Sequence, residues 1–183
     1  MAEETELQLL QSIKDHDRQA MRRLYDRYAG HALAIALRYV GSREDARDVV
    51  QDSFVKILTS VSRFNYRGEG TLKAWVGRIV CNRAIDYVQS RQQMTFVSDV
   101  PDDTADPPPD VEQIAPDVLT RLIGQLPSGY RLVLNMYVFE ELPHKTIAQR
   151  LGISESTSAS QLNRAKKRLA QLIRNYLKHQ ENL

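Results

Sequence analysis

Short polar side chains and cations share one segment near the C-terminus, SESTSASQLNRAKKR, which spans residues 154–168. Serine, threonine and asparagine can exchange hydrogen bonds with the edges of nucleic-acid bases, and lysine and arginine neutralise phosphates. Between Leu142 and Lys178 there are eight lysines and arginines against one acid, Glu155. This excess of positive charge is typical of a nucleic-acid-binding surface, although many basic helices are only solvated faces.

Two helices joined by a tight turn are expected to position these side chains. The sequence predicts a short helix over 143–151, with Pro143 in its first turn, because a missing N–H costs nothing there. Gly152 can adopt the positive φ that ends a helix, and Ser154 can cap a second helix that runs to about Leu177. An inward apolar stripe leaves the polar and basic residues on the opposite face, which is the pattern of a helix-turn-helix. The stripe consists of Leu162, Ala165, Leu169 and Ile173.

A second basic segment lies between residues 62 and 91, and aromatic residues interleave with its cations. Aromatic rings stack on unpaired bases and cations follow the backbone, so this composition favours single-stranded nucleic acid. Trp75 fits the buried stripe of the expected helix equally well. The cations are Arg63, Arg67, Lys73, Arg78, Arg83 and Arg91, and the aromatic residues are Phe64, Tyr66, Trp75 and Tyr87.

A third group of residues at helical spacing is acidic, with one apolar member. It comprises Asp45, Asp48, Gln51, Asp52 and Val55. An acidic face repels DNA but can dock on a basic or coiled-coil protein surface, and Val55 is an apolar contact point within it. An ordinary solvated helix face is an equally good interpretation.

The apolar periodicity is helical throughout, which predicts an all-α fold of two small domains. Helices are expected over 17–39, from a capping Ser42 to Val61, and from a capping Thr71 to Arg91. The apolar stripe of the second helix consists of Ala46, Val49, Val50, Phe54, Ile57, Leu58 and Val61. After residue 117, helices are expected near 118–126 and over 130–139. Between Gln92 and Asp117 lie five of the seven prolines and seven acids, with no lysine or arginine, which predicts an acidic linker. The predicted domains are residues 1–92 and 117–183, the second with the helix-turn-helix, and the linker is 93–116.

Composition argues against several other classes of protein. The four histidines are scattered and none has metal-ligand spacing with Cys81, so we expect no metal, no cofactor and no catalytic residue. Cys81 fits a buried helix face better than a nucleophilic site. The N-terminal residues lack the pattern of a signal peptide, and no apolar run is long enough for membrane insertion, which favours a cytoplasmic protein.

The order of these features resembles the extracytoplasmic-function group of RNA polymerase sigma factors. EDARDVVQDSFVKI (44–57) is similar to the region 2 helix that binds the coiled-coil of the polymerase β′ subunit. LKAWVGRIVCNRAIDYVQSR (72–91) is similar to the helix that recognises and opens the −10 element. Residues 118–177 resemble region 4, which reads the −35 element and contacts the β flap. The resemblance implies a promoter-specificity subunit that binds core polymerase and promoter DNA and is controlled by an anti-sigma factor.

The resemblance also implies roles for individual residues. Residues 64–71 match the loop that receives a flipped-out base, and Asp86 matches an acid that supports this loop. The implied −10 contacts are Phe64, Tyr66, Arg67, Trp75, Arg78, Asn82 and Arg83. The implied −35 contacts are Ser156, Ala159, Ser160, Asn163, Arg164, Lys167 and Arg168. The implied polymerase contacts are Asp45, Asp48, Gln51, Asp52 and Val55, and the linker matches a segment directed towards the active-site cleft.

Five positions depart from the usual family pattern. These departures do not change the expected fold, but they leave the preferred −35 sequence open. The STSASQL variant resembles sigma factors of the Bacteroidetes. The positions are Pro143, Thr146, Ser158, Ala159 and Gln161. Two non-enzymatic alternatives also remain, a dimeric DNA-binding regulator and a polymerase-binding adaptor that does not melt DNA.

Overall fold

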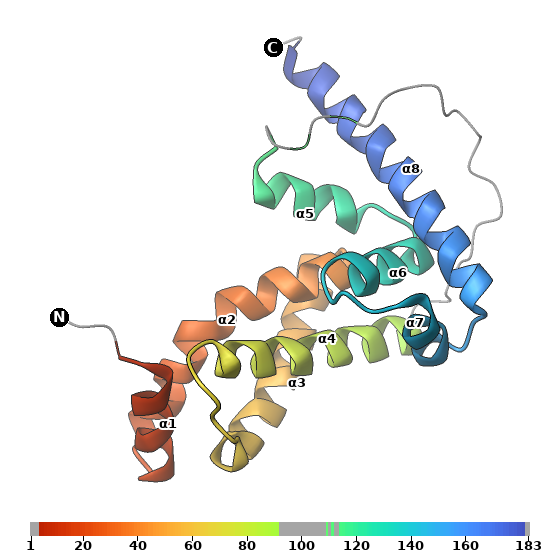
Figure 1. The fold of residues 1–183 in the computed structure, drawn as a ribbon. Helices are drawn as coiled ribbons and strands as arrows, with labels where there is room; N and C mark the ends of the chain where they lie inside the picture. Colours follow the sequence, from red (N-terminus) through yellow and green to blue (C-terminus); the bar gives the residue numbers. More distant parts are fainter. Residues whose placement is uncertain (1–3, 92–108, 110, 112–113, 182–183) are drawn as a thin grey trace. The chain divides into compact units, whose positions relative to one another are not determined.

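The computed structural model describes residues 4–91, 109, 111 and 114–181. These residues form two compact units, one within 1–37 and 42–87 and the other within 38–41 and 88–183. Every regular element in the described ranges is helical, as the sequence predicts (Figure 1). Most of the predicted linker, residues 93–116, lies outside the described residues.

The first unit begins with a helix that the sequence pattern did not predict, α1 (Glu6–Lys14). Thr5 and Gln8 form a capping box in which each side chain accepts a backbone N–H of the other residue. α1 buries Leu9, Leu10 and Ile13. It is too short to show a clear apolar period from sequence, and its contacts with the rest of the unit fix it in place.

Three longer helices supply most of the first unit, and the last residues of the first and third of them, 38–40 and 88–91, belong to the second unit. They are α2 (Arg18–Val40), α3 (Arg43–Ser60) and α4 (Thr71–Arg91), and a short 3-10 turn, η1 (Val61–Arg63), follows α3. Ser42 caps α3 as predicted, because its hydroxyl accepts the N–H of Asp45 at 3.3 Å. The predicted apolar stripe of α3 is buried except for Leu58, which is half-buried, and Ala46, Val49 and Ile57 are fully inaccessible to solvent.

The start of α4 differs from the prediction. Thr71 is the first residue of the helix, and its hydroxyl donates to the carbonyl of Gly68 at 2.6 Å. The N–H groups of Leu72 and Lys73 are instead accepted by the carboxylate of Glu6. The capping role assigned to Thr71 was therefore wrong, because an acid distant in sequence takes that place.

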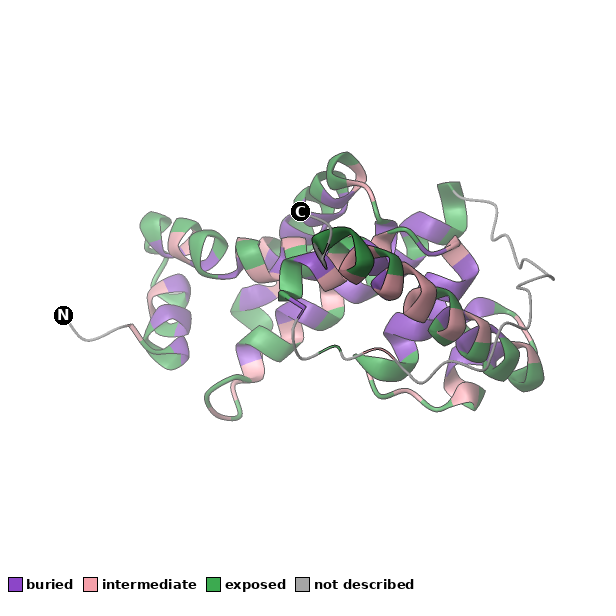
Figure 2. Ribbon diagram, turned by 90° about the horizontal axis from the view of Figure 1, so that it is seen from above, coloured by how far each residue is buried: buried purple, intermediate pink, exposed green. Residues whose placement is uncertain are grey.

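The second unit contains α5 (Pro116–Gly124), α6 (Ser128–Val138), α7 (His144–Leu151) and α8 (Glu155–Glu181). The inner side of α8 packs on α5, where Ile173 shares a buried cluster with Val118 and Leu122. Figure 2 shows the buried residues along the helices. Arg131 is buried within this unit, and its guanidinium donates to the carbonyls of Gly124 at 2.8 Å and Leu126 at 3.0 Å. These bonds fix the turn between α5 and α6.

The turn between α7 and α8 has the predicted geometry. Gly152 has φ 68° and ends α7, and its N–H donates to the carbonyl of Ala148. Ser154 caps α8, because its hydroxyl accepts the N–H of Thr157 at 3.0 Å. Pro143 lies one residue before α7, at the capping position, and not inside the first turn as predicted. Its missing N–H is harmless at either position.

Candidate nucleic-acid and protein interfaces

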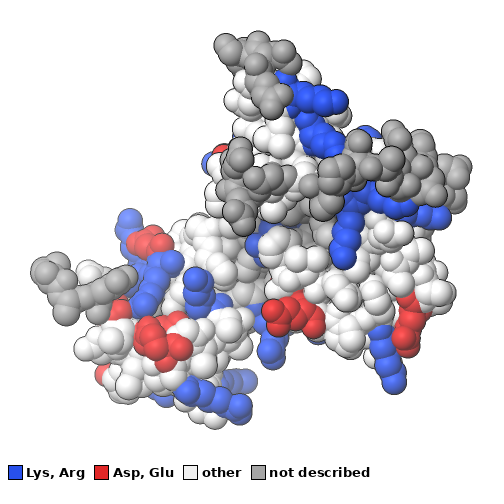
Figure 3. Space-filling model, turned by 45° about the horizontal axis from the view of Figure 1, so that its top comes forward, with Lys and Arg blue, Asp and Glu red and all other residues white. Residues whose placement is uncertain are grey.

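The outer side of α8 carries all the residues that the sequence assigned to the −35 element. Ser156, Ala159, Ser160, Asn163 and Arg168 are exposed, and Arg164 and Lys167 are half-buried. Figure 3 shows lysine and arginine side chains on the surface that α8 forms. The described part of this helix therefore presents small polar residues first and cations behind them, which suits base edges and phosphates respectively.

Two of the departures from the family pattern do not lie on this surface. Ser158 is fully buried and Gln161 is only 2% exposed, so both side chains face the interior of the helix-turn-helix. The Ser158 hydroxyl lies 2.9 Å from Nδ1 of His144, whose ring stacks on Tyr137 at 4.7 Å between centroids. Ser158 therefore joins α8 to the start of α7. Among Ser158, Ala159 and Gln161, only Ala159 is exposed.

A cavity of about 480 Å³ opens between the loop before α4 and the first turns of that helix. The rings of Phe64 and Trp75 lie 5.1 Å apart at its wall, and three arginines surround it. Its polar and aromatic lining can stack a planar base and neutralise its phosphates. The lining residues are Arg63, Phe64, Asn65, Arg67, Thr71, Ala74, Trp75 and Arg78.

Trp75 lies at the edge of the core and also borders this cavity. Leu72 and Val76 are fully buried, whereas Trp75 is half-buried and lines the cavity. Asn65 and Ala74 also line it, and sequence reasoning missed both. Asn65 belongs to the loop already singled out, whereas Ala74 offers no chemical signal of its own.

The loop is held by its own polar residues and by Arg27 of α2. The Tyr66 hydroxyl donates to Glu69 at 3.1 Å, and Arg27 of α2 lies 3.6 Å from the other oxygen of the same carboxylate. Burial and the bond to Glu69 raise the pKa of Tyr66, so its hydroxyl stays protonated and remains a donor. Gly68 and Gly70 have φ values of 130° and 85°, which few other residues adopt.

Three predicted −10 residues do not line the cavity, Tyr66 in the loop and Asn82 and Arg83 farther along α4. Asn82 is exposed, and Arg83 forms a salt bridge with Asp52 of α3. Asp52 was assigned to polymerase binding, so the structure links two residues to which sequence gave separate roles. Tyr87 is only 5% exposed and its hydroxyl donates to Asp45. Its inclusion among the stacking aromatic residues was therefore wrong, because a buried ring offers no face to a base.

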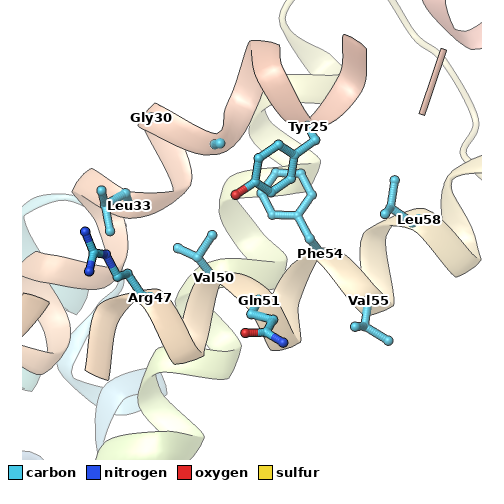
Figure 4. Close-up of a pocket in the computed structure, with 10 residues that line it drawn as sticks. Tyr25, Gly30, Leu33, Arg47, Val50, Gln51, Phe54, Val55 and Leu58 are labelled. Atoms are coloured by element: carbon cyan, nitrogen blue, oxygen red, sulfur yellow. The ribbon is translucent and has the colours of Figure 1, made fainter. Parts of the chain in front are cut away.

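The acidic side of α3 adjoins an apolar groove of about 620 Å³ between α2 and α3. Asp48, Gln51 and Asp52 are exposed, and Asp45 is half-buried. Figure 4 shows Tyr25 of α2 against Phe54 of α3, with ring centroids 4.6 Å apart, and Val55 and Gln51 at the edge of the groove. Val55 is 61% exposed. The groove is lined mainly by apolar side chains together with Arg47, and the acidic residues lie on the adjoining side of α3. Such a groove can receive the apolar side chains of a partner helix.

Three further observations concern the cysteine, possible metal ligands and possible membrane-spanning helices. Cys81 is buried, as expected for a core residue. Within the described ranges, no group of three or more histidine, cysteine, aspartate or glutamate side chains could hold a metal ion. None of the described helices combines the length and the hydropathy needed to cross a membrane.

Comparisons with known proteins identify both units. Residues 24–94 match the family model for sigma-70 region 2, and residues 117–169 match the model for sigma-70 region 4. RNA polymerase sigma-H factor of Pseudomonas aeruginosa is 25% identical over 91% of this chain and 92% of its own length. The ECF RNA polymerase sigma factor SigM of Bacillus subtilis is 26% identical over 81% of this chain and 92% of its own length.

A solved structure of CnrH in complex with the cytosolic domain of CnrY aligns with a TM-score of 0.46 and 24% identity. The alignment covers 91% of this chain and 96% of that one. The two matched regions occupy about two thirds of the present sequence in the expected order. The chain therefore belongs to the sigma-70 family, as an alternative sigma factor of the extracytoplasmic-function type that directs promoter recognition by RNA polymerase and is not an enzyme.

Proposed function

We propose that this sigma factor contacts promoter DNA at two separate points and core polymerase through α3. The observation that carries the proposal is the pairing of an aromatic–arginine cavity in the region 2 unit with an exposed polar and basic face on α8. Each surface suits a different form of DNA, because the cavity can accept an unpaired base and the helix can enter the major groove of a duplex.

The −10 site is the cavity together with the outer side of α4. A base flipped out of the duplex loses a few kcal/mol of stacking, which a closely fitting pocket can restore. Phe64 and Trp75 offer ring surface, while Arg63, Arg67 and Arg78 offer charge for the adjoining phosphates. Asn82, farther along α4, would contact the same strand, with Arg83 and Tyr66 beside the site.

The −35 site is the outer side of α8. Ser156, Ala159 and Ser160 lie at the leading end of the helix, where small side chains allow close approach to base edges. Asn163 and Arg164 follow, and Lys167 and Arg168 would contact phosphates. Because Ser158 and Gln161 are buried, the preferred sequence depends on the exposed residues and not on these two departures.

The polymerase contact of the first unit is the acidic side of α3 with the groove beside it. The β′ coiled-coil is the proposed occupant, since a helix can place apolar side chains in the groove and basic ones against the exposed acids on the adjoining side of α3. The β flap would contact the region 4 unit. We further propose an anti-sigma factor as regulator, a Bacteroidetes-like lineage, and the cytoplasm, where core polymerase works, as the site of action.

Reconstituted transcription with core polymerase of a related bacterium tests the proposal. The holoenzyme should give a promoter-specific transcript that depends on both promoter elements. A chain that binds core polymerase normally but yields no promoter-specific transcript would overturn the proposal. Specific binding to a palindromic site without polymerase would favour a dimeric regulator instead.

A further inference from the structure

A carboxylate from α1 is buried against the first turn of α4. Glu6 is 2% exposed, and its oxygens accept the backbone N–H groups of Leu72 and Lys73, each at 3.1 Å. The hydroxyl of Tyr28 donates to the same carboxylate at 2.9 Å. Burial and this bond raise the pKa of Tyr28, so the hydroxyl keeps its proton. A buried carboxylate is stable only with such a set of donors.

These bonds provide hydrogen-bond acceptors for backbone N–H groups at the start of α4. The first N–H groups of any helix have no partner within the helix, and the positive end of the helix dipole favours an anion. The hydroxyl of Thr71 is occupied by its bond to the carbonyl of Gly68. The first turn of α4 is therefore held by a residue that lies 66 positions before Leu72 in the sequence.

The same turn forms one wall of the cavity assigned to the −10 element. Leu72 and Lys73 lie between Thr71 and Ala74, which both line the cavity, and Trp75 follows directly. A change in the direction of this turn would move the Trp75 ring relative to Phe64, which belongs to the loop. The carboxylate of Glu6 thus bonds to the backbone of the cavity wall itself.

The loop on the other side of the cavity is tied to the same N-terminal segment. Arg27 donates to the carbonyl of Glu4 at 2.6 Å and lies 3.6 Å from the carboxylate of Glu69. Glu69 in turn accepts the hydroxyl of Tyr66. Residues 4–6 therefore connect to both walls, through Glu6 to α4 and through Arg27 to the loop.

We propose that Glu6 is a positioning residue for the −10 pocket, and that α1 is an integral part of this site although it precedes the matched region 2 segment, residues 24–94. The proposal rests on the proposed function, in which the cavity receives an unpaired base. Glu6 sets the direction of the first turn of α4, and that direction sets the gap between Trp75 and Phe64. Loss of the carboxylate should weaken −10 binding selectively, whereas a residue needed only for folding would affect all the activities of the chain.

Glu6→Gln is the most discriminating change. The two side chains have the same shape, but glutamine has one oxygen, so its NH2 group would face a backbone N–H as donor against donor. Asp15→Asn at the end of α1 is the matched control, because Asp15 is exposed and its carboxylate accepts a bond from Gln11 of its own helix. Trp75→Ala tests the pocket itself.

The measurement uses holoenzyme assembled from the full chain and core polymerase. Affinity is determined for a single-stranded oligonucleotide with the −10 sequence, for a −35 duplex, and for core polymerase alone. Glu6→Gln should weaken oligonucleotide binding about tenfold, as expected for one lost charged hydrogen bond. The other two affinities should stay within about twofold of wild type, because distant sites behave independently. Hydrogen exchange at the amides of Leu72 and Lys73 should become faster.

The possible outcomes are distinct. Normal oligonucleotide binding by Glu6→Gln, with weak binding by Trp75→Ala, would overturn the role of Glu6 and leave the proposed function standing. Normal binding by both variants would overturn both proposals. If Glu6→Gln also lost affinity for core polymerase, Glu6 would be needed only for folding, and the inference would be overturned. If Glu6→Gln does not fold, Tyr28→Phe removes one donor to the carboxylate and should weaken oligonucleotide binding about threefold; an unchanged affinity would contradict the inference.

Discussion

At the scale of single residues, Arg164 is the sharpest test of the −35 assignment. It lies on the outer side of α8, so Arg164→Ala should leave the helix folded. Loss of one base or phosphate contact costs about 1–3 kcal/mol of binding free energy. Holoenzyme affinity for a −35 duplex, measured at fixed salt concentration, checks this expectation. Lys178→Ala, which lies beyond the predicted contacts on the same helix, is the control and should retain full affinity.

A substitution at Val55 tests the proposed polymerase-binding side of α3. Val55→Asp places a charge at the edge of the apolar groove, and burying an unpaired carboxylate under a partner helix is costly. Since Val55 is exposed, the change should not unfold the chain, yet affinity for core polymerase should fall at least about tenfold. Lys56→Ala, at the neighbouring exposed position, serves as control. Equal affinity of the Val55 variant and wild type would contradict docking at this groove.

The residue scale also shows the limits of sequence reasoning. Helical spacing was sufficient to place the −35 candidates on one accessible side of α8, because that prediction needs only periodicity. Spacing could not identify the capping role of Glu6, since the contact with Leu72 joins two distant parts of the chain. Nor could it show that Ser158 is buried, because small polar residues occur on both sides of a helix.

At the scale of elements, two glycines should respond oppositely to the same substitution. Gly152 has φ 68°, so Gly152→Ala forces a left-handed conformation that costs about 1–2 kcal/mol. Gly30 lies inside α2, and the space that an alanine methyl group would occupy there is open, so Gly30→Ala should stabilise the first unit by roughly 0.5–1 kcal/mol. Calorimetric unfolding of both variants measures the two effects. A change of stability in the same direction for both variants would contradict the backbone conformations assigned to Gly152 and Gly30.

The predicted elements agree with the structure wherever a long apolar stripe or a strong terminator defined them. The turn at Gly152 and the caps at Ser42 and Ser154 were identified from sequence because their chemistry is local. α1 was missed because nine residues provide too few turns for a clear period. Thr71 was misassigned because a threonine before an apolar run looks like a cap even when another side chain fills that role.

At the scale of the whole molecule, we predict that the free chain is a poor DNA-binding protein. The two DNA surfaces belong to separate units, and each offers few contacts by itself. The chain should sediment as a monomer and protect no specific site in a footprint without polymerase. A stable dimer that protects a palindrome at the same salt concentration would support the regulator class instead.

The most direct test of the central claim is permanganate reactivity of thymines near −10 in complexes with holoenzyme. On a promoter recognised by this factor, wild type should make these thymines reactive, and replacement of the −35 element should abolish the signal. Trp75→Ala should reduce it while leaving the −35 region protected, because the two contacts are separate. Protection of the promoter without reactive thymines would show an adaptor that does not melt DNA and would contradict the proposed two-point recognition.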